Sequence, residues 1–256
     1  MKRESFGSRL GFILVSAGCA IGIGNVWKFP YICGAYGGAA FILIYLCFLV
    51  ILGIPVLVAE FAVGRGSHTS VAKCFDKLAP AGSCWKPLKF IGIIGCYMLM
   101  MFYTTVGGWM IYYCVKSLRG DFVGATPEAV TQSFSDMLGN APTMMLWMVI
   151  ICLIGFAVCF MGLQNGIEKI SKVMMSALLI IMVILAVHSV MMEGAGEGIR
   201  FYLVPDFQKI KDAGVGNVVF AALSQSFFTL SIGIGAMLIF GSYLNGGKSL
   251  LGEAVN

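Results

Sequence analysis

Long stretches without a charged residue constrain this chain more than any other feature. Six of them reach or exceed roughly 18 residues, the length at which an apolar segment becomes a candidate membrane span. Charged residues are only 11% of the chain, against about 25% in ordinary soluble domains. A soluble core cannot bury so much apolar surface, so we expect an all-α membrane protein, with residues 1–256 forming a single multi-pass domain. The expected spans are residues 10–36, 39–64, 88–118, 143–162, 167–192 and 215–245.

The basic residues gather in the connections between these spans and do not form one stripe. This pattern argues against a nucleic-acid partner and fits the positive-inside rule, by which cytoplasmic loops carry an excess of Lys and Arg. We therefore expect a protein of the cell membrane (plasma or inner membrane) with its N-terminus in the cytoplasm. The basic residues then assigned to the inner side are Lys2, Arg3, Arg9, Arg65, Lys73, Lys77, Lys86, Lys89, Lys169, Lys172 and Lys248.

Several other classes of protein fit the sequence poorly. The nine cysteines form no CxxC pair and most lie in apolar stretches, so we interpret them as packing residues. An intramembrane enzyme needs its reacting groups at one depth, whereas Glu60 and His188 lie at different inferred depths and His188 has no HExxH motif. The sequence also lacks the repeated filter motifs or acidic rings of channels. We expect neither an enzyme nor a channel, and no bound cofactor.

Two of the expected spans are interrupted near their centres. The first contains Gly18, Gly22 and Gly24, each of which weakens a helix by about 1 kcal/mol relative to alanine. The last contains hydroxyls and glycines over residues 224–235. Freed backbone groups in hydrocarbon are costly unless they face protein, water or a ligand. Their carbonyl oxygens suit a hard cation such as sodium, and half-helix N-termini suit a carboxylate.

Simpler interpretations exist for these features. The glycines could serve only close helix packing, but polar residues in both interrupted spans favour a binding site. Glu60 is the carboxylate that lies deep inside a hydrophobic run, which makes it a functional candidate, although it could instead pair with another helix for structure alone. Tyr103 could be a packing aromatic, because the same span holds Tyr97 and Tyr112.

At these residues the chain resembles the neurotransmitter:sodium symporter family, in its bacterial amino-acid branch. The resemblance implies helices 1 to 6 of the inverted-repeat sodium symporter fold, with helices 1 and 6 broken. It covers essentially this whole chain but only the N-terminal half of the family's usual length, so the first repeat is followed by one helix of the second and the C-terminal half is absent. The matching motifs are RLGF (9–12), AIGIGNVWKFP (20–30), GGAAF (37–41), GIP (53–55), EFAVGR (60–65) and QSFFTLSIGIG (225–235).

The resemblance also implies roles for individual residues. Two sodium ions would be bound by carbonyls and side chains of Gly18, Ala20, Ile21, Asn25 and Thr229. The substrate would contact Ala20, Ile23, Gly24, Leu99, Tyr103, Phe228, Thr229, Ser231 and Ile234. Gate or supporting roles would fall to Arg3, Phe6, Lys28, Glu60, Gln225 and Tyr243.

The chain departs from the family pattern at both gates. Lys28 stands where an arginine is usual at the outer gate, and a lysine pairs only as a point charge. Phe6 stands where a tryptophan is usual at the inner latch, which would be weaker here. Gln225 and Tyr45 match positions that help to bind chloride in chloride-dependent relatives. Chloride dependence stays open.

The function implied is sodium-coupled symport of amino acids or related small carboxylate solutes by alternating access. Gly24 favours an amino acid over a monoamine, but the sequence does not tell which amino acid. Neither sodium site is complete in one copy, so we expect a truncated or half-length form whose candidate partner is a second copy or a separate C-terminal half. The alternative is a transport-incompetent membrane fragment or a regulatory subunit of a symporter.

Overall fold

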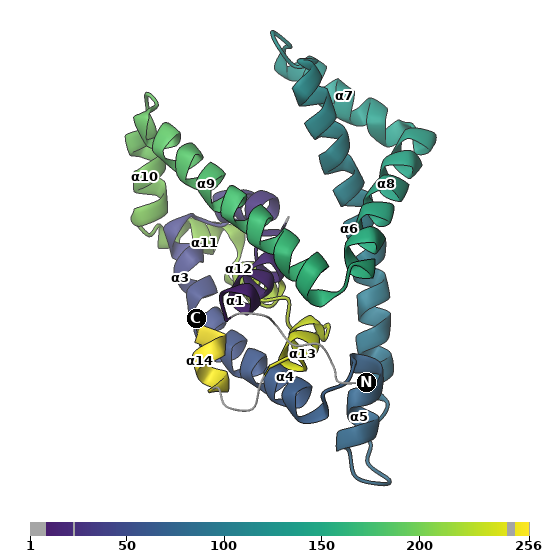
Figure 1. Ribbon diagram of the computed structural model, residues 1–256. Coiled ribbons are helices and arrows are strands. Elements are labelled where there is room, and N and C mark those ends of the chain that lie inside the picture. Colours follow the sequence, from purple (N-terminus) through teal and green to yellow (C-terminus); the bar gives the residue numbers. More distant parts are fainter. Residues whose placement is uncertain (1–8, 23, 245–248, 256) are drawn as a thin grey trace. The chain divides into compact units, whose positions relative to one another are not determined.

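A computed structural model describes residues 9–22, 24–244 and 249–255 of the chain. The described residues are helical with connecting turns, and they contain no strand (Figure 1). The chain forms two compact units, of which the first comprises Met1–Gly92 with Leu163–Asn256 and the second Ile93–Gly162. The expected single multi-pass domain stays a prediction, and each unit is described by itself.

The first expected span is broken, as predicted. Helix α1 (Arg9–Ala20) is followed after a short gap by a π-helical turn, η1 (Gly24–Lys28), and by α2 (Phe29–Ala35). The two halves meet at an angle of 52°. Glycines weaken the helix at the break, and Pro30 sits in the first turn of α2, where its missing N–H costs no hydrogen bond.

The second span is one continuous helix of 29 residues, Ala39–Ser67. It consists of α3 (Ala39–Phe48), a π-helical turn η2 (Leu49–Gly53) and α4 (Ile54–Ser67). The wide turn η2 comes directly before the first turn of α4, which contains Pro55. Proline lacks an N–H, and its ring crowds the preceding turn. Gly53 also admits Leu230, whose Cδ1 atom would lie 2.5 Å from a Cβ at that position.

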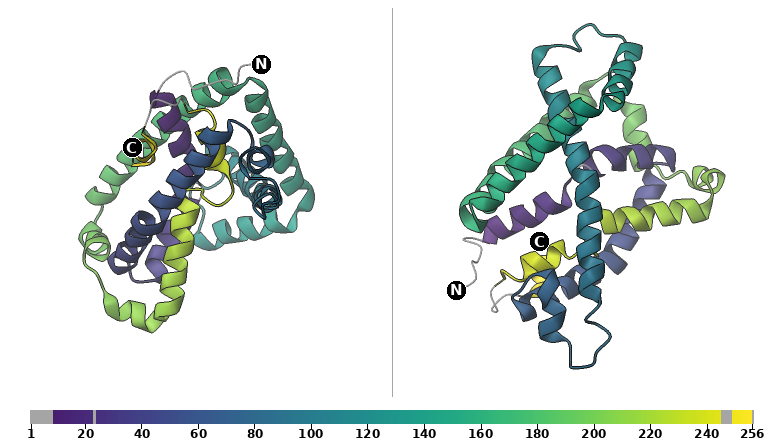
Figure 2. Two further views of the ribbon diagram at one scale, coloured as in Figure 1. Left: turned by 90° about the horizontal axis from the view of Figure 1, so that it is seen from below. Right: turned by 90° about the vertical axis from the view of Figure 1, so that its right-hand side faces the viewer.

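The sixth span is also broken, as the resemblance implied. Helix α12 (Val215–Thr229) lies along α3, and α13 (Ala236–Gly241) lies against α4 (Figure 2). Residues 230–235 between them are not helical. The other helices of this unit are α5 (Val71–Leu78), the first residues of α6 (Leu88–Arg119), η3 (Leu163–Glu168), α9 (Lys169–Met191), α10 (Ala195–Leu203), α11 (Phe207–Ala213) and α14 (Leu250–Val255).

The second unit contains most of α6 together with α7 (Pro127–Gly139) and α8 (Ala141–Phe160). Two side chains cap these helices. The Thr126 hydroxyl accepts a hydrogen bond from the Ala129 N–H at 3.3 Å, and the side-chain oxygen of Asn140 accepts one from the Thr143 N–H at 3.1 Å. Each cap satisfies an N–H group that has no partner within its own helix.

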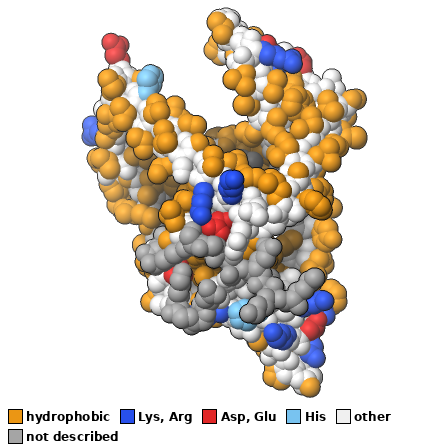
Figure 3. All heavy atoms as spheres, in the orientation of Figure 1, with side chains coloured by type: hydrophobic (Ala, Val, Ile, Leu, Met, Phe, Trp, Pro, Cys, Tyr) orange, Lys and Arg blue, Asp and Glu red, His pale blue; other side chains and the backbone are white. Residues whose placement is uncertain are grey.

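Four of the described helices are long and apolar enough to cross a membrane, and the bent pair of α1 with η1 and α2 makes a fifth candidate. The four are Ala39–Ser67, Leu88–Arg119, Ala141–Phe160 and Leu163–Met191. Their apolar side chains are largely exposed, and orange surface covers much of the face in Figure 3. Such surface is stable in lipid but not in water. The sixth span does not reach this length as one helix, because it is broken after Thr229.

Small residues allow α4 and α13 to pack with their backbones in contact. A Cβ at Gly64 would collide with the Leu238 carbonyl oxygen and would lie 2.9 Å from the Ser242 nitrogen. A Cβ at Gly241 would lie 2.8 Å from the Phe61 carbonyl oxygen. These contacts are to backbone atoms, which cannot rotate away as a side chain can. Glycine at positions 64 and 241 is therefore required for α13 to pack this closely against α4.

Replacing Gly64 should therefore loosen this contact. We expect Gly64→Ala to lower the unfolding free energy by about 1–3 kcal/mol, the usual cost of overpacking, as measured by thermal unfolding in detergent. Gly66→Ala is the matched control in the same helix, because a Cβ there meets only the Leu78 side chain at 3.7 Å. Equal melting temperatures for the two variants would contradict the account of this interface.

Candidate functional site

The two helix breaks lie against each other and are joined by side-chain hydrogen bonds. The Thr229 hydroxyl donates to the Asn25 side-chain oxygen at 2.9 Å, across 204 residues of sequence. The Ser231 hydroxyl donates to the carbonyl oxygen of Cys19 at 2.9 Å, across 212 residues. The polar groups exposed by each break are thus satisfied in part by the other.

Asn25 lies at the centre of a cluster of polar groups where the two breaks meet, formed with Ala20, Gln225 and Thr229. Its side-chain nitrogen donates to the carbonyl oxygen of Ala20 at 2.7 Å, which spans the gap between α1 and η1. Its side-chain oxygen also accepts from the Gln225 amide at 3.3 Å. Gln225 is only 2% exposed, and the same amide lies 3.5 Å from the Thr229 hydroxyl. The Gln225 amide therefore lies among oxygens of Asn25, Thr229 and the Gly24 carbonyl, and the Ala20 carbonyl lies against the Asn25 amide.

The second break depends on backbone conformations that side chains rarely allow. Gly233 and Gly235 have φ values of 88° and 78°, which glycine adopts without steric cost. Ser231 has φ 51° despite its side chain, a conformation that persists only where surrounding contacts impose it. The hydrogen bond from Ser231 to Cys19 is such a contact.

Glu60 supports this break from the side of α4. One carboxylate oxygen accepts from the Gly233 N–H at 2.6 Å, and the other accepts from the Leu238 N–H at 3.3 Å. Both N–H groups belong to the non-helical segment or to the first turn of α13, where helical partners are missing. A carboxylate beside these groups is also favoured by the positive end of the helix dipole.

Phe228 covers the start of η1. A Cβ at the buried Gly24 would collide with the Phe228 ring. The Lys28 ammonium lies 5.6 Å from the centroid of the same ring, a cation–π contact. Sequence reasoning placed Lys28 at the outer gate and Phe228 in the pocket, but it missed this contact between them, because nothing in the order of residues brings the two side chains together.

The remaining residues of the predicted sites are less closely grouped. Gly18 and Ile21 line a cavity of about 600 Å³ together with Ser171 and apolar side chains of α9. Ile234 is half-buried in the second break, and Tyr243 is half-buried in the turn after α13. Leu99 and Tyr103 lie on α6 within the second unit, so their part in the site stays a prediction. Arg3, Phe6 and Ile23 fall outside the described residues.

One contact of the cluster was not anticipated by sequence reasoning. The Cys19 carbonyl accepts a hydrogen bond from the Ser231 hydroxyl, whereas the carbonyls expected to act in this break were those of Gly18, Ala20 and Ile21. The signal was its position inside the glycine-rich break, where every backbone oxygen that lacks a helical partner needs another donor. Tyr45, matched above to chloride binding, is buried in α3 with its ring centroid 5.0 Å from that of Phe29.

Known proteins are similar to this chain in sequence and in fold. The profile of the Sodium:neurotransmitter symporter family matches residues 3–132 and 128–255. YhdH of Bacillus subtilis, described as an uncharacterized sodium-dependent transporter, is 37% identical over 243 residues, which are 95% of this chain and 53% of YhdH. The sodium-dependent serotonin transporter of Drosophila melanogaster is 29% identical over 283 residues, covering 94% of this chain and 43% of the transporter.

A solved structure has the same fold. The crystal structure of MhsT in complex with L-phenylalanine matches with a TM-score of 0.88 at 37% identity, covering 99% of this chain and 57% of MhsT. The chain spans about half the length of the curated relatives it matches.

The match confirms the expected fold, helices 1 to 6 of a sodium symporter with the first and sixth broken. It also confirms that the family is one of membrane transporters and not of enzymes. Since the family profile covers nearly every residue and the two breaks meet as the resemblance implied, the chain belongs to the sodium:neurotransmitter symporter family.

Proposed function

We propose that this chain carries amino acids or related small carboxylate solutes together with sodium, by alternating access. The observation that carries the proposal is the oxygen cluster where the two breaks meet, formed by the Ala20 carbonyl, the Asn25 amide and the Thr229 hydroxyl. Hard cations prefer such uncharged oxygen ligands in transporters with broken helices. The Thr229 hydroxyl can turn its hydrogen away from Asn25, because a hydroxyl both donates and accepts.

The proposed second sodium site uses the carbonyls of Gly18 and Ile21. Gly18 lies in the last turn of α1 and Ile21 directly follows this helix, and both line the cavity that α1 shares with α9. Carbonyl oxygens at the end of a half-helix carry its negative dipole end, which favours a cation. Gly18 leaves room beside the chain, since a Cβ there would approach the Met175 side chain at 3.2 Å.

The substrate carboxylate would lie at the start of η1, against the N–H groups of Ile23 and Gly24. The positive end of a half-helix and its free N–H groups favour an anion there. Phe228 and Ile234 would form apolar walls, with Leu99 and Tyr103 completing the pocket. Phe228 now lies where a Gly24 side chain would be, so a bound substrate packs on this ring or displaces it. Because the MhsT structure holds L-phenylalanine, phenylalanine is the first substrate to test.

The proposed transporting unit lies in the cell membrane with a cytoplasmic N-terminus, Lys28 on the outer side, and Arg3 and Phe6 on the inner side. Relatives are about twice as long as this chain, so a second copy or a separate C-terminal half would supply the remaining ligands. The same difference in length favours a second candidate function, a transport-incompetent fragment or a regulatory subunit. Sodium-dependent binding without uptake would identify it.

Uptake by proteoliposomes tests the proposal directly. We expect an inward sodium gradient to drive uptake of labelled phenylalanine or another amino acid. Asn25→Ala should lower this uptake at least tenfold, because it removes an oxygen of the cluster and the bridge to Ala20. Thr229→Val keeps the side-chain shape, removes the hydroxyl, and should raise the sodium concentration needed for half-maximal uptake.

Asn217→Ala is the matched control for this experiment. Asn217 is exposed near the start of α12, and its amide donates to the Ala213 carbonyl at 3.3 Å, far along the helix from Thr229. This variant should transport like the unmodified chain. Uptake at the same rate in potassium as in sodium would refute sodium coupling.

Glu60 gives a second prediction. In Glu60→Gln one of the two carboxylate oxygens becomes an amide that cannot accept from the Gly233 or Leu238 N–H. We expect the unfolding free energy to fall by about 1–3 kcal/mol and sodium-driven uptake to fall with it. Thermal unfolding in detergent measures the first effect, with Glu193→Gln in an exposed loop as the control. An unchanged melting temperature would show that Glu60 does not hold the break.

A further inference from the structure

The connection between α4 and α6 forms a basic surface at one face of the membrane. It comprises residues 68–87, and both helices that it joins are long and apolar enough to span. The connection therefore lies where lipid headgroups meet water. It contains α5, whose Val71 and Cys74 are buried against Leu238. The opposite side of α5 presents Lys73 and Lys77 to solvent.

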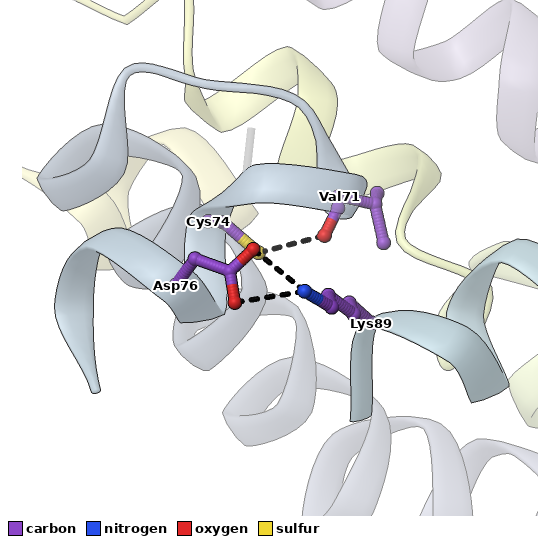
Figure 4. A network of polar contacts seen from close by, with 4 residues as sticks. All are labelled: Val71, Cys74, Asp76 and Lys89. Atoms are coloured by element: carbon purple, nitrogen blue, oxygen red, sulfur yellow. Dashed lines mark hydrogen bonds and ion pairs between the residues drawn. The ribbon is translucent and has the colours of Figure 1, made fainter. Parts of the chain in front are cut away.

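Polar contacts fix this short helix in place. The Lys89 ammonium lies 2.7 and 2.9 Å from the two carboxylate oxygens of Asp76, which ties α5 to the start of α6 (Figure 4). The Cys74 thiol donates to the Val71 carbonyl at 3.3 Å. The Lys77 ammonium donates to the Ser67 carbonyl at the end of α4, at 2.7 Å. The helix is thus oriented before any ligand binds.

The local charge is strongly positive. Asp76 is the only acidic residue between positions 68 and 89 and is paired with Lys89. Lys73 and Lys77 are exposed and Lys86 is half-buried, and the Lys77 ammonium keeps further N–H donors beyond its bond to Ser67. Lys73, Lys77 and Lys86 are called the lysine cluster below.

Apolar side chains accompany the lysine cluster. Trp85 is 63% exposed and Leu78 is 45% exposed. Exposed tryptophan beside lysine is typical of protein surface at the headgroup level of a bilayer, where the ring is partly in lipid and its N–H meets water.

A cavity of about 210 Å³ lies directly behind α5. Its walls come from α4, α5, the start of α6 and the second helix break, and they are mostly apolar. Glu60 is the charged residue in the lining, and both of its oxygens already accept backbone hydrogen bonds. Ile91 stands in the lining with 66% of its surface exposed. Apolar residues in the lining include Val56, Val63, Val71, Phe75, Leu88 and Ile91.

We propose that this surface binds an anionic phospholipid, with the phosphate of its headgroup at the lysine cluster and part of one acyl chain in the cavity behind α5. Basic residues beside a membrane span attract anionic lipid. The apolar cavity favours a lipid over a free anion, because a lipid carries a charged headgroup and a hydrocarbon chain in one molecule. The position of the connection at the end of two spans favours a lipid over an acidic peptide. Since Gly233 and Gly235 also line the cavity, the bound chain contacts the second break and stabilises its non-helical form.

Thermal unfolding of the purified chain in neutral detergent tests the proposal. Adding phosphatidylglycerol should raise the melting temperature saturably, whereas phosphatidylcholine with the same acyl chains should not. The double variant Lys73→Gln/Lys86→Gln loses two positive charges. Its apparent affinity for phosphatidylglycerol should be weaker by about fivefold for each lysine, or roughly 25-fold in total. Both side chains reach the surface, so the fold should be kept. The matched control is Lys211→Gln, because Lys211 is an exposed lysine of α11, outside the connection. This variant should bind phosphatidylglycerol with unchanged affinity.

Three results would overturn the proposal. They are equal stabilisation by phosphatidylcholine, unchanged phosphatidylglycerol affinity in the double variant, and equal stabilisation by inorganic phosphate, which would mean a free-anion site. A phosphatidylglycerol with short acyl chains tests the cavity without a mutation and should bind more weakly than the long-chain lipid. None of these measurements requires transport. The proposed lipid site can therefore be refuted without refuting the proposed symport, and the symport can be refuted without refuting the lipid site.

Discussion

The structure depends on the cost of leaving backbone hydrogen-bonding groups without partners inside a membrane. Two apolar spans are interrupted, and each interruption frees N–H and carbonyl groups that lipid cannot satisfy. The chain resolves this by placing the two breaks together, so that Thr229 bonds to Asn25 and Ser231 bonds to the Cys19 carbonyl. The breaks therefore bring polar groups of both spans together at the place where the proposed ion and carboxylate sites lie.

The surrounding helices serve to hold this arrangement. Glu60 reaches from α4 to two N–H groups of the second break. Gly64 and Gly241 let α4 and α13 approach until their backbones touch, which keeps Glu60 within reach. The cavity behind α5 shares its walls with the same break. A lipid in that cavity would contact Gly233 and Gly235 of the second break, and an ion at Asn25 would contact Thr229 directly before this break.

Much of this was predictable from the sequence, for identifiable reasons. Runs without charge predicted the long apolar helices, and clustered glycines predicted both breaks, because apolar length and helix propensity are local properties. The cost of a carboxylate in lipid singled out Glu60 as a candidate, and the structure shows that it bonds to the second break. The partners of these residues were not derivable from spacing, since Asn25 and Thr229 are 204 residues apart. Their pairing came from the family resemblance, and the contacts of Lys28 with Phe228 and Ser231 with Cys19 came only from the structure.

Hydrogen exchange tests most directly whether the two breaks form one sodium site. The backbone amides of residues 18–25 and 224–235 would be followed by mass spectrometry in sodium and in potassium at equal ionic strength. The account predicts that sodium slows exchange in both segments together, with the same concentration dependence, and that Asn25→Ala abolishes the effect in both. Protection of only one segment, or equal protection in potassium, would contradict a shared site.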